Sequence, residues 1–330
     1  MYKYSPTFAL FQFPFYYLPN QIGLLLWSIL ISMIVVRAIY SLPITLYQAN
    51  LLAIICFLEN LTCLQNFQTN GLMAAAMLFV FIGLESGKNL KAAINAISSI
   101  MIKIFGAFVL CQYIFYRLKI RNIVINTTVL LFFVLLPGLF IGFDGLKLQY
   151  LNWLDMLSVD LKDEVGMSLM HIIQAFSSQS VNFSYIQLLG ISFSLIPLIN
   201  VKAYKSFDFR FLYLALLLIA SVSLNHKAES PTFIIAIVGI GIWYIFSRLH
   251  QGFKLCFLFF SLILTSLSPS SLFPAFIRSE YITPYALKGL PSALTWLMLT
   301  VELTFYKISS AQLKTNPSPI CAGFDQVNHY

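Results

Sequence analysis

The chain alternates between long apolar runs and short polar segments over most of its 330 residues. A bilayer core about 30 Å thick needs about 20 apolar residues per helix, and fewer where a helix is broken. The pattern predicts about eleven spanning or half-spanning helices, at 21–37, 42–58, 69–84, 91–103, 104–116, 123–141, 184–200, 209–225, 231–247, 254–268 and 290–306. We therefore expect an all-α integral membrane protein, built as one polytopic bundle.

The segment 91–116 decides how the chain is threaded through the membrane. A single helix here would bury Lys103 near the middle of the bilayer, which costs several kcal/mol. Two short helices, at 91–103 and 104–116, bring Lys103 to a polar surface instead. With this break, most of the 20 Lys and Arg residues fall on one side, as the positive-inside rule expects of the cytoplasmic side. The sequence thus predicts a helix pair that turns at Lys103.

The segments outside the spans have their own patterns. Residues 1–20 include a short apolar stretch interrupted by Pro14, which predicts an interfacial helix. The longest outer segment, 142–183, is expected to contain amphipathic helices lying at the interface. Residues 1–306 then form a single membrane domain, and the polar residues 307–330 form a cytoplasmic tail.

Composition supports the membrane class and argues against several others. Hydrophobic residues make up 59% of the chain and charged residues only 10%, whereas soluble proteins carry about 25% charged residues. The net charge of +8 comes from basic residues scattered between apolar runs, so it indicates topology and not a nucleic-acid partner. The five Cys residues show no CxxC motif and no ligand spacing with His, so no metal site is predicted.

Polar side chains gather on the predicted outer side. The candidates for substrate binding or catalysis are Tyr4, Glu59, Asn66, Gln68, Asn70, Lys103, His226 and Lys227. Amide groups both donate and accept hydrogen bonds with hydroxyls, and lysines neutralise phosphate. If they face one cavity at membrane level, these groups suit a substrate that contains a sugar and a phosphate.

Each group also has a simpler explanation. The amides could cap the helix that starts near Gly71, and Lys103 could extend its ammonium group to the interface. His226 shares a short loop with Glu229, which could be a solvated turn. However, eight polar residues within the stretch 59–70 exceed what helix capping requires. A binding role is therefore the favoured interpretation.

Three stretches resemble the glycosyltransferase 87 family. "YKYSPTFALFQFPFYYLPNQIGLLLW" is similar to the family segment in which a Tyr-x-Pro start precedes an apolar helix, a Pro and a Trp-bearing span. "FQTN" resembles the Gly-Gln-x-Asn motif, which is followed by a helix and a short helix ending in a Lys. Gln68 and Asn70 match this motif, and Phe67 replaces its Gly. "LNHKAESPTF" resembles the late His-bearing loop and places His226, so the resemblance extends over about residues 2–246.

This resemblance implies a GT-C fold in a bacterial inner membrane. The implied reaction moves a hexose, with mannose expected, from a polyprenyl-phosphate donor to a lipid-linked or cell-envelope glycan acceptor at the outer face. A base deprotonates the acceptor hydroxyl while cations stabilise the departing phosphate, and no cofactor is implied. Lys103 and Lys227 would then hold the donor phosphate, and Gln68 and Asn70 the sugar, while His226 would orient acceptor or phosphate.

The resemblance also implies a difference at the start of the chain. Members of the family begin with a further helix and an outer loop that carries an Asp, their presumed base. Here the chain starts at "MYKYSP", and no Asp or Glu precedes Glu59. We therefore expect a chain that is truncated or catalytically impaired, with His226 and Glu59 as candidates for a supporting or substitute catalytic role.

Two other classes of function stay open. An intramembrane charge and broken helices also suit a transporter, a flippase or a polymerase of envelope polysaccharides. Against this class, the sequence shows no inverted repeat, and its polar residues gather on one side. The third class is a structural partner without catalytic activity.

Overall fold

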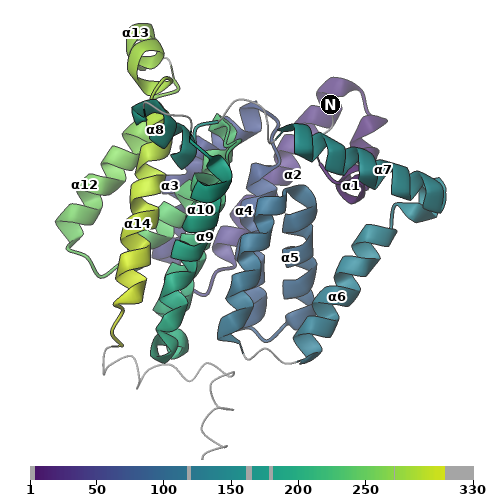
Figure 1. Cartoon of the computed structure of the whole chain (residues 1–330), viewed down its shortest axis with the longest axis horizontal. Coiled ribbons are helices and arrows are strands. Elements are labelled where there is room, and N and C mark those ends of the chain that lie inside the picture. The colour runs from purple at the N-terminus through teal and green to yellow at the C-terminus, as the bar shows by residue number, and fades with distance from the viewer. Residues whose placement is uncertain (1–3, 117–119, 161–165, 178–180, 271, 309–330) are drawn as a thin grey trace, which may run out of the picture.

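The computed structural model describes residues 4–116, 120–160, 166–177, 181–270 and 272–308. In this part of the chain the regular structure is helical, without strands, as the apolar pattern predicts. Figure 1 shows upright helices packed side by side, with short helices lying across the upper end of the bundle. Beyond residue 308, the predicted tail lies outside the described part.

The helices follow one another closely along the chain. The first half contains α1 (Pro6–Tyr16), α2 (Asn20–Tyr40), α3 (Leu46–Gln65), α4 (Asn70–Glu85), α5 (Asn89–Ile102), α6 (Ile120–Leu135) and α7 (Gly138–Asp160). The second half contains α8 (Leu169–Phe176), α9 (Phe183–Leu195), α10 (Phe207–Ser223), α11 (Phe233–Phe246), α12 (Gln251–Ser261), α13 (Ala275–Ile277) and α14 (Leu290–Thr304). The 3₁₀ segments are η1 (Ile104–Phe115), η2 (Ile196–Ile199), η3 (Val201–Lys205), η4 (Ser230–Thr232) and η7 (Leu287–Gly289), and the π-helical ones are η5 (Leu262–Leu267) and η6 (Arg278–Ile282).

Helices α10 and α11 form the centre of the bundle. Most side chains of both helices are buried, as expected for helices that are hydrophobic on all sides. A β-carbon added at Gly239 would lie 2.8 Å from the carbonyl oxygen of Ala215 and 2.6 Å from Cγ1 of Ile219. The missing side chain lets the two helices approach closely, and α3, α4 and α14 pack around this pair.

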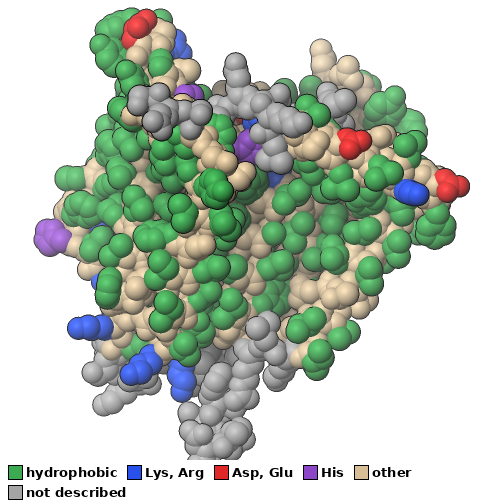
Figure 2. Space-filling model, in the orientation of Figure 1, with side chains coloured by type: hydrophobic (Ala, Val, Ile, Leu, Met, Phe, Trp, Pro, Cys, Tyr) green, Lys and Arg blue, Asp and Glu red, His purple; other side chains and the backbone are tan. Residues whose placement is uncertain are grey.

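Apolar side chains also cover the outside of the bundle. Figure 2 shows a broad hydrophobic surface, with acidic side chains near its upper end and Lys or Arg side chains gathered at the lower left. By length and composition α2 and α3 can each cross a membrane, and the bent pair of α6 and α7 would make a third span. Other apolar helices, at 70–85, 104–115, 183–199, 230–246 and 251–267, are shorter. The prediction of about eleven spanning or half-spanning helices is therefore confirmed only in part, because only two or three of the described helices are clear spans.

The short helix predicted within residues 1–20 is α1. The Ser5 hydroxyl accepts a hydrogen bond from the backbone N of Phe8 at 3.2 Å, and Pro6 occupies the first helical position. Both features favour the start of a helix. Ser5 Oγ also donates to the carbonyl oxygen of Met101 at 2.7 Å, which ties the start of α1 to the end of α5.

Helix α3 continues past the predicted end of its span at residue 58. It begins with a reciprocal cap, in which Thr45 Oγ1 accepts from the backbone N of Gln48 at 3.3 Å and Gln48 Oε1 accepts from the backbone N of Thr45 at 3.0 Å. The helix then runs to Gln65. Glu59, which the sequence places in an outer segment, is consequently a helical residue about two turns before the end of α3.

The chain reverses at Lys103, as the sequence predicts. Lys103 is extended, with φ −148° and ψ 136°, and η1 packs beside α5. A β-carbon added at Gly106 would lie 2.4 Å from the carbonyl oxygen of Ser99, so only glycine lets the two arms come this close. The break in the segment 91–116 is therefore confirmed, although the second arm is wound as a 3₁₀ helix.

The predicted span at 123–141 is wrong in its second half. The axes of α6 and α7 meet at an angle of 87°, on either side of Pro137. Proline lacks the N–H that continues a helix, and Gly142, with φ 72° and ψ 171°, interrupts α7 again. The chain consequently turns sideways, and α7 extends outward at the upper end of the bundle (Figure 1).

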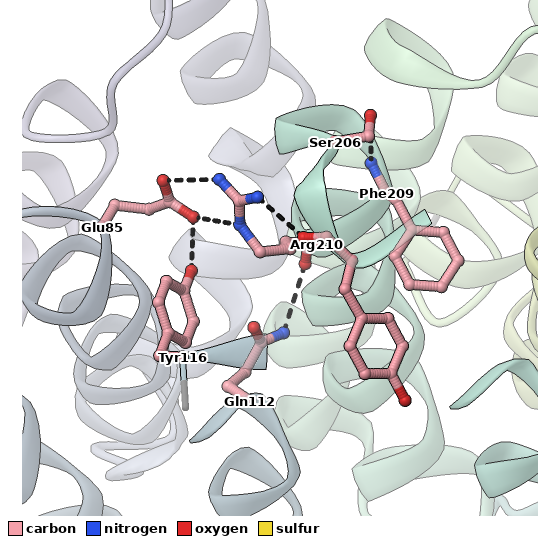
Figure 3. A network of polar contacts seen from close by, with 7 residues as sticks. Glu85, Gln112, Tyr116, Ser206, Phe209 and Arg210 are labelled. Atoms are coloured by element: carbon pink, nitrogen blue, oxygen red, sulfur yellow. Dashed lines mark hydrogen bonds and ion pairs between the residues drawn. The ribbon is translucent and has the colours of Figure 1, made fainter. Parts of the chain in front are cut away.

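A buried ionic network lies at the far end of α4 from Asn70. Glu85 accepts hydrogen bonds from Nε of Arg210 at 2.6 Å, from Nη2 at 2.9 Å, and from the hydroxyl of Tyr116 (Figure 3). Gln112 donates to the carbonyl oxygen of Arg210 at 3.3 Å. Arg210 is only 4% exposed, and the two-pronged pairing offsets much of the cost of burying its charge. The network joins α4, η1 and α10 at this end.

Candidate functional site

Two of the predicted substrate-binding residues meet where α4 starts and α5 ends. The ammonium group of Lys103 donates to Oδ1 of Asn70 over 2.7 Å. Asn70 is fully buried and Lys103 is half-buried. The contact arises because α4 and α5 pack against each other as a hairpin. A cation and an amide are thereby held together at the break in the chain.

Helix capping does not account for Asn70. Thr69 occupies the N-cap position of α4, and Asn70 is already the first helical residue. Nδ2 of Asn70 and Oδ1 of Asn60 are both buried without a protein hydrogen-bond partner. A buried polar group without a hydrogen-bond partner destabilises the fold by about 1–3 kcal/mol. Groups of this kind are typical of places that bind a polar ligand or water.

A tight turn through Phe67 connects α3 to α4. Phe67 has a φ of 51°, in the left-handed region, which costs a residue with a side chain roughly 1–2 kcal/mol. Its carbonyl oxygen accepts from Nε1 of Trp27 at 3.4 Å. Glycine adopts this conformation freely, which explains why a Gly suits this position in the Gly-Gln-x-Asn motif. The turn leads directly into Gln68.

Gln68 links the N-terminal segment to the loop before α11. The hydroxyl of Tyr4 donates to Oε1 of Gln68 at 3.4 Å, and Nε2 of Gln68 donates to Oε2 of Glu229 at 3.5 Å. Burial raises the pKa of the Tyr4 phenol above its ordinary value of 10.0, so the hydroxyl stays a neutral donor. We refer to a set of five residues as the Lys103 cluster: Tyr4, Gln68, Asn70, Lys103 and Glu229.

His226 and Lys227 lie in the loop between α10 and η4. The carbonyl oxygen of His226 accepts from the backbone N of Gly166 at 2.6 Å, and that of Ala228 accepts from the backbone N of Met167 at 2.7 Å. A β-carbon added at Gly166 would lie 2.5 Å from the carbonyl oxygen of Ala228, so this approach requires glycine. The side chain of His226 is 8% exposed. The braced loop reaches Glu229, and hence the Lys103 cluster, three residues later.

Glu59 is buried in an ion pair. Its Oε1 lies 3.0 Å from Nζ of Lys288, and the two side chains are 0% and 1% exposed. The Lys288 ammonium also lies 5.1 Å from the ring centre of Phe233, and Thr265 donates to the Lys288 carbonyl oxygen at 3.1 Å. A carboxylate enclosed in this way does not reach an acceptor hydroxyl, so the geometry favours a supporting role for Glu59.

Asn66 turns back onto its own helix. It follows the last turn of α3, and its Nδ2 donates to the carbonyl oxygen of Thr62 at 2.8 Å. The side chain is exposed. This contact stabilises the end of α3.

Two charged residues were not among the candidates predicted from the sequence. Glu229 was noted beside His226 only as part of what could be a solvated turn, although a carboxylate three positions after a candidate histidine is a signal for a site. Lys288 is 229 residues away from Glu59, and no local pattern connects the two. Only the packing of η7 and η5 near α3 brings them together.

A family model matches most of the chain. The model of glycosyltransferase family 87 covers residues 2–269, a range that includes the whole Lys103 cluster. Neither the curated proteins nor the solved structures give a match.

Proposed function

The chain belongs to glycosyltransferase family 87, whose members are membrane glycosyltransferases that act on a sugar donor and an acceptor, and we propose on this basis that it transfers a hexose from a polyprenyl-phosphate donor. The proposed sugar is mannose, and the proposed acceptor is a lipid-linked or cell-envelope glycan. The reaction would take place in the cytoplasmic membrane, with the Lys103 cluster facing its outer side.

The contact between Lys103 and Asn70 is the observation that carries this proposal. A half-buried ammonium group beside an amide can bind a phosphate oxygen while the amide binds a sugar hydroxyl. Gln68 offers a second amide, and its Cα is at most about 7 Å from that of Asn70 because the two are two residues apart. We assign the donor phosphate to Lys103 and the sugar to Gln68 and Asn70.

The other predicted residues have subsidiary parts in this proposal. Lys227 adds a second cation for the phosphate, and His226 orients the acceptor or the phosphate from the braced loop. Tyr4 holds Gln68 through its hydroxyl. Glu59 has a supporting role through its ion pair with Lys288. Asn66, at the end of α3, would contact the substrate only at the rim.

The distribution of polar groups supports a transferase over a transporter. Between Asn70 and Glu85, the buried residues of α4 are mostly apolar, among them Met77, Leu78 and Phe81. A transporter needs polar binding sites along a path across the membrane. In the described part of the chain, α4 instead separates the Lys103 cluster from the network around Glu85.

The test is a transfer assay on the full chain in lipid nanodiscs. Radiolabelled polyprenyl-phosphate mannose is the first donor, and a membrane glycolipid extract supplies the acceptors. Label in a new glycolipid supports the proposal. Label that remains in the donor with mannose, glucose and galactose alike would exclude it.

Accessibility labelling tests the transporter alternative. Single Cys residues at positions 68, 103 and 226 should react with impermeant thiol reagents from one side only. Reaction from both sides in turn would favour transport, and a chain that neither transfers nor transports would be a structural partner.

A further inference from the structure

Two hydroxyl groups at the start of α1 bind carbonyl groups at two separate breaks in the chain. Ser5 Oγ donates to the carbonyl oxygen of Met101 at 2.7 Å, and Thr7 Oγ1 donates to that of Phe133 at 2.7 Å. Ser5 and Thr7 are both 0% exposed. Two buried hydrogen bonds of equal length therefore attach α1 to the last turn of α5 and to the last turn of α6.

Both carbonyl groups lie where a helix cannot supply their partner. Met101 is in the last turn of α5, which ends at Ile102, and Lys103 after it is extended. The last carbonyl groups of a helix have no partner within it. Phe133 lies four residues before Pro137, which lacks the N–H that a continuing helix would offer. Each hydroxyl of α1 thus satisfies a carbonyl group that a break in the chain releases.

The bond of Ser5 lies next to the Lys103 cluster. Ser5 directly follows Tyr4, whose hydroxyl donates to Oε1 of Gln68 at 3.4 Å, and Met101 stands two residues before Lys103. Neighbouring Cα atoms are about 3.8 Å apart. Tyr4 and Ser5 together therefore form a short bridge between the proposed sugar-binding amide of Gln68 and the turn that carries Lys103.

The bond of Thr7 lies at the bend between α6 and α7. The hydroxyl of Tyr150, in α7, is 3.0 Å from Thr7 Oγ1. Because the single proton of the Thr7 hydroxyl goes to Phe133, Tyr150 donates to Thr7. This contact holds the bend, and none of its three residues belongs to the Lys103 cluster.

We propose that Ser5 is a positioning residue for the donor phosphate, an inference that rests on the proposed function. Its bond to Met101 fixes the main chain before Lys103, while Asn70 holds the ammonium group at the end of the flexible lysine side chain. The phosphate and the sugar of the donor share one oxygen atom, so the groups that bind them must keep a set spacing. Ser5 supplies this spacing through Tyr4 and Gln68, without itself touching the substrate.

Titration of polyprenyl phosphate into nanodiscs that contain the full chain tests the proposal. Ser5→Ala removes the bond to Met101, and we expect the Kd to rise roughly 3- to 10-fold, because a neutral hydrogen bond has an effect of this size. Ser5→Thr keeps a hydroxyl at the same place and should keep most of the affinity. An unchanged Kd in Ser5→Ala would overturn the proposal.

Thr7→Ala is the matched control. It removes a hydrogen bond of the same length and burial from the same helix, but at the bend between α6 and α7. Thermal melting should show that both alanine variants are destabilised, and Ser5→Ala at least as much, because it also loses the N-cap of α1. The Kd should rise in Ser5→Ala alone. An equal rise in both variants would make the role of Ser5 purely structural and would contradict the proposal.

A double variant decides whether Ser5 acts through Lys103. If it does, Ser5→Ala should change the Kd very little in a chain that already carries Lys103→Ala. The same fold-change with and without the ammonium group would exclude this route. If Ser5→Ala folds poorly, Ser5→Gly replaces it in both measurements, because glycine is a tolerated N-cap residue and also lacks the hydroxyl.

The outcomes separate this inference from the function on which it rests. If the unaltered chain transfers sugar and Ser5→Ala binds polyprenyl phosphate equally well, the positioning role fails and the proposed function stands. If the unaltered chain neither binds polyprenyl phosphate nor transfers sugar from any donor, the proposed function fails and the positioning role fails with it.

Discussion

Lys288 and Glu59 form a fully buried ion pair across 229 residues of sequence, with Nζ 3.0 Å from Oε1. The pair links η7, at the end of an irregular segment, to the second half of the long helix α3. Neither charge has access to solvent, because the side chains are 1% and 0% exposed. Each charge therefore depends on the other, and the position of η7 depends on both.

Breaking this pair should destabilise the protein strongly. Lys288→Met leaves the Glu59 carboxylate buried without its partner, and we expect a loss of about 3–5 kcal/mol. The double variant Lys288→Met with Glu59→Leu should lose much less, because no unpaired charge remains. Thermal melting in detergent measures both. Equal losses in the single and the double variant would contradict the pairing.

Removing the ammonium group of Lys103 should weaken donor binding. A hydrogen bond to a charged group contributes about 1.5–3 kcal/mol, so Lys103→Ala should raise the Kd for polyprenyl phosphate roughly 10- to 150-fold. Titration of the lipid into nanodiscs that contain the protein measures this change. Lys91→Ala is the control, since Lys91 is exposed near the other end of the same helix. A Kd that stays the same in Lys103→Ala would remove Lys103 from the donor site.

The left-handed backbone of Phe67 predicts that glycine can replace this residue without loss of stability. Phe67→Gly relieves a strained backbone, so we expect the melting temperature to stay the same or to rise slightly. Phe67→Val places a β-branched side chain in the same conformation, and should cost roughly 1–2 kcal/mol more. Melting curves of the two variants give the comparison. A glycine variant less stable than the valine variant would contradict the conformation of this turn.

A side chain at Gly166 should disturb the loop that carries His226. In Gly166→Ala the new β-carbon would meet the carbonyl oxygen of Ala228 at 2.5 Å, so the two backbones must move apart. Overpacking of this kind costs about 1–3 kcal/mol, and transfer activity should fall as well. The control is Gly252→Ala in α12, where the nearest atoms belong to the movable side chain of His250 at 3.3 Å. Melting temperature and initial rate report the two effects.

The helices and the break at Lys103 could be predicted because they follow from local energetic costs. A charge in the middle of the membrane is expensive wherever the neighbours lie, so Lys103 marks the turn without knowledge of its contacts. Helices α10 and α11 are apolar on all sides, so their burial could likewise be predicted from the sequence. For the same reason Pro137 is a local signal, and the span at 123–141 could have been ended there.

Contacts between distant segments could not be predicted in this way. The proposed site residues Asn70 and Lys103 come together only through the α4–α5 hairpin, and Glu59 meets Lys288 only in the assembled bundle. The positive φ of Phe67 could not be predicted either, because a residue with a side chain normally avoids this conformation and adopts it only where the surrounding structure imposes it. The sequence shows which chemical groups are present, and packing decides which of them come into contact.

The 3₁₀ winding of η1 has a consequence for the length of the chain at this point. A 3₁₀ helix rises about 2.0 Å per residue and an α-helix 1.5 Å, so the 12 residues of η1 stretch over about 24 Å instead of about 18 Å. Lys103 stands before this rod and Tyr116 after it, each bound to a different part of α4. Deleting one residue would shorten the rod by about 2 Å and rotate one end by about 120° against the other, because three residues make a turn. Evolution can therefore exchange the side chains of this segment far more easily than it can alter their number.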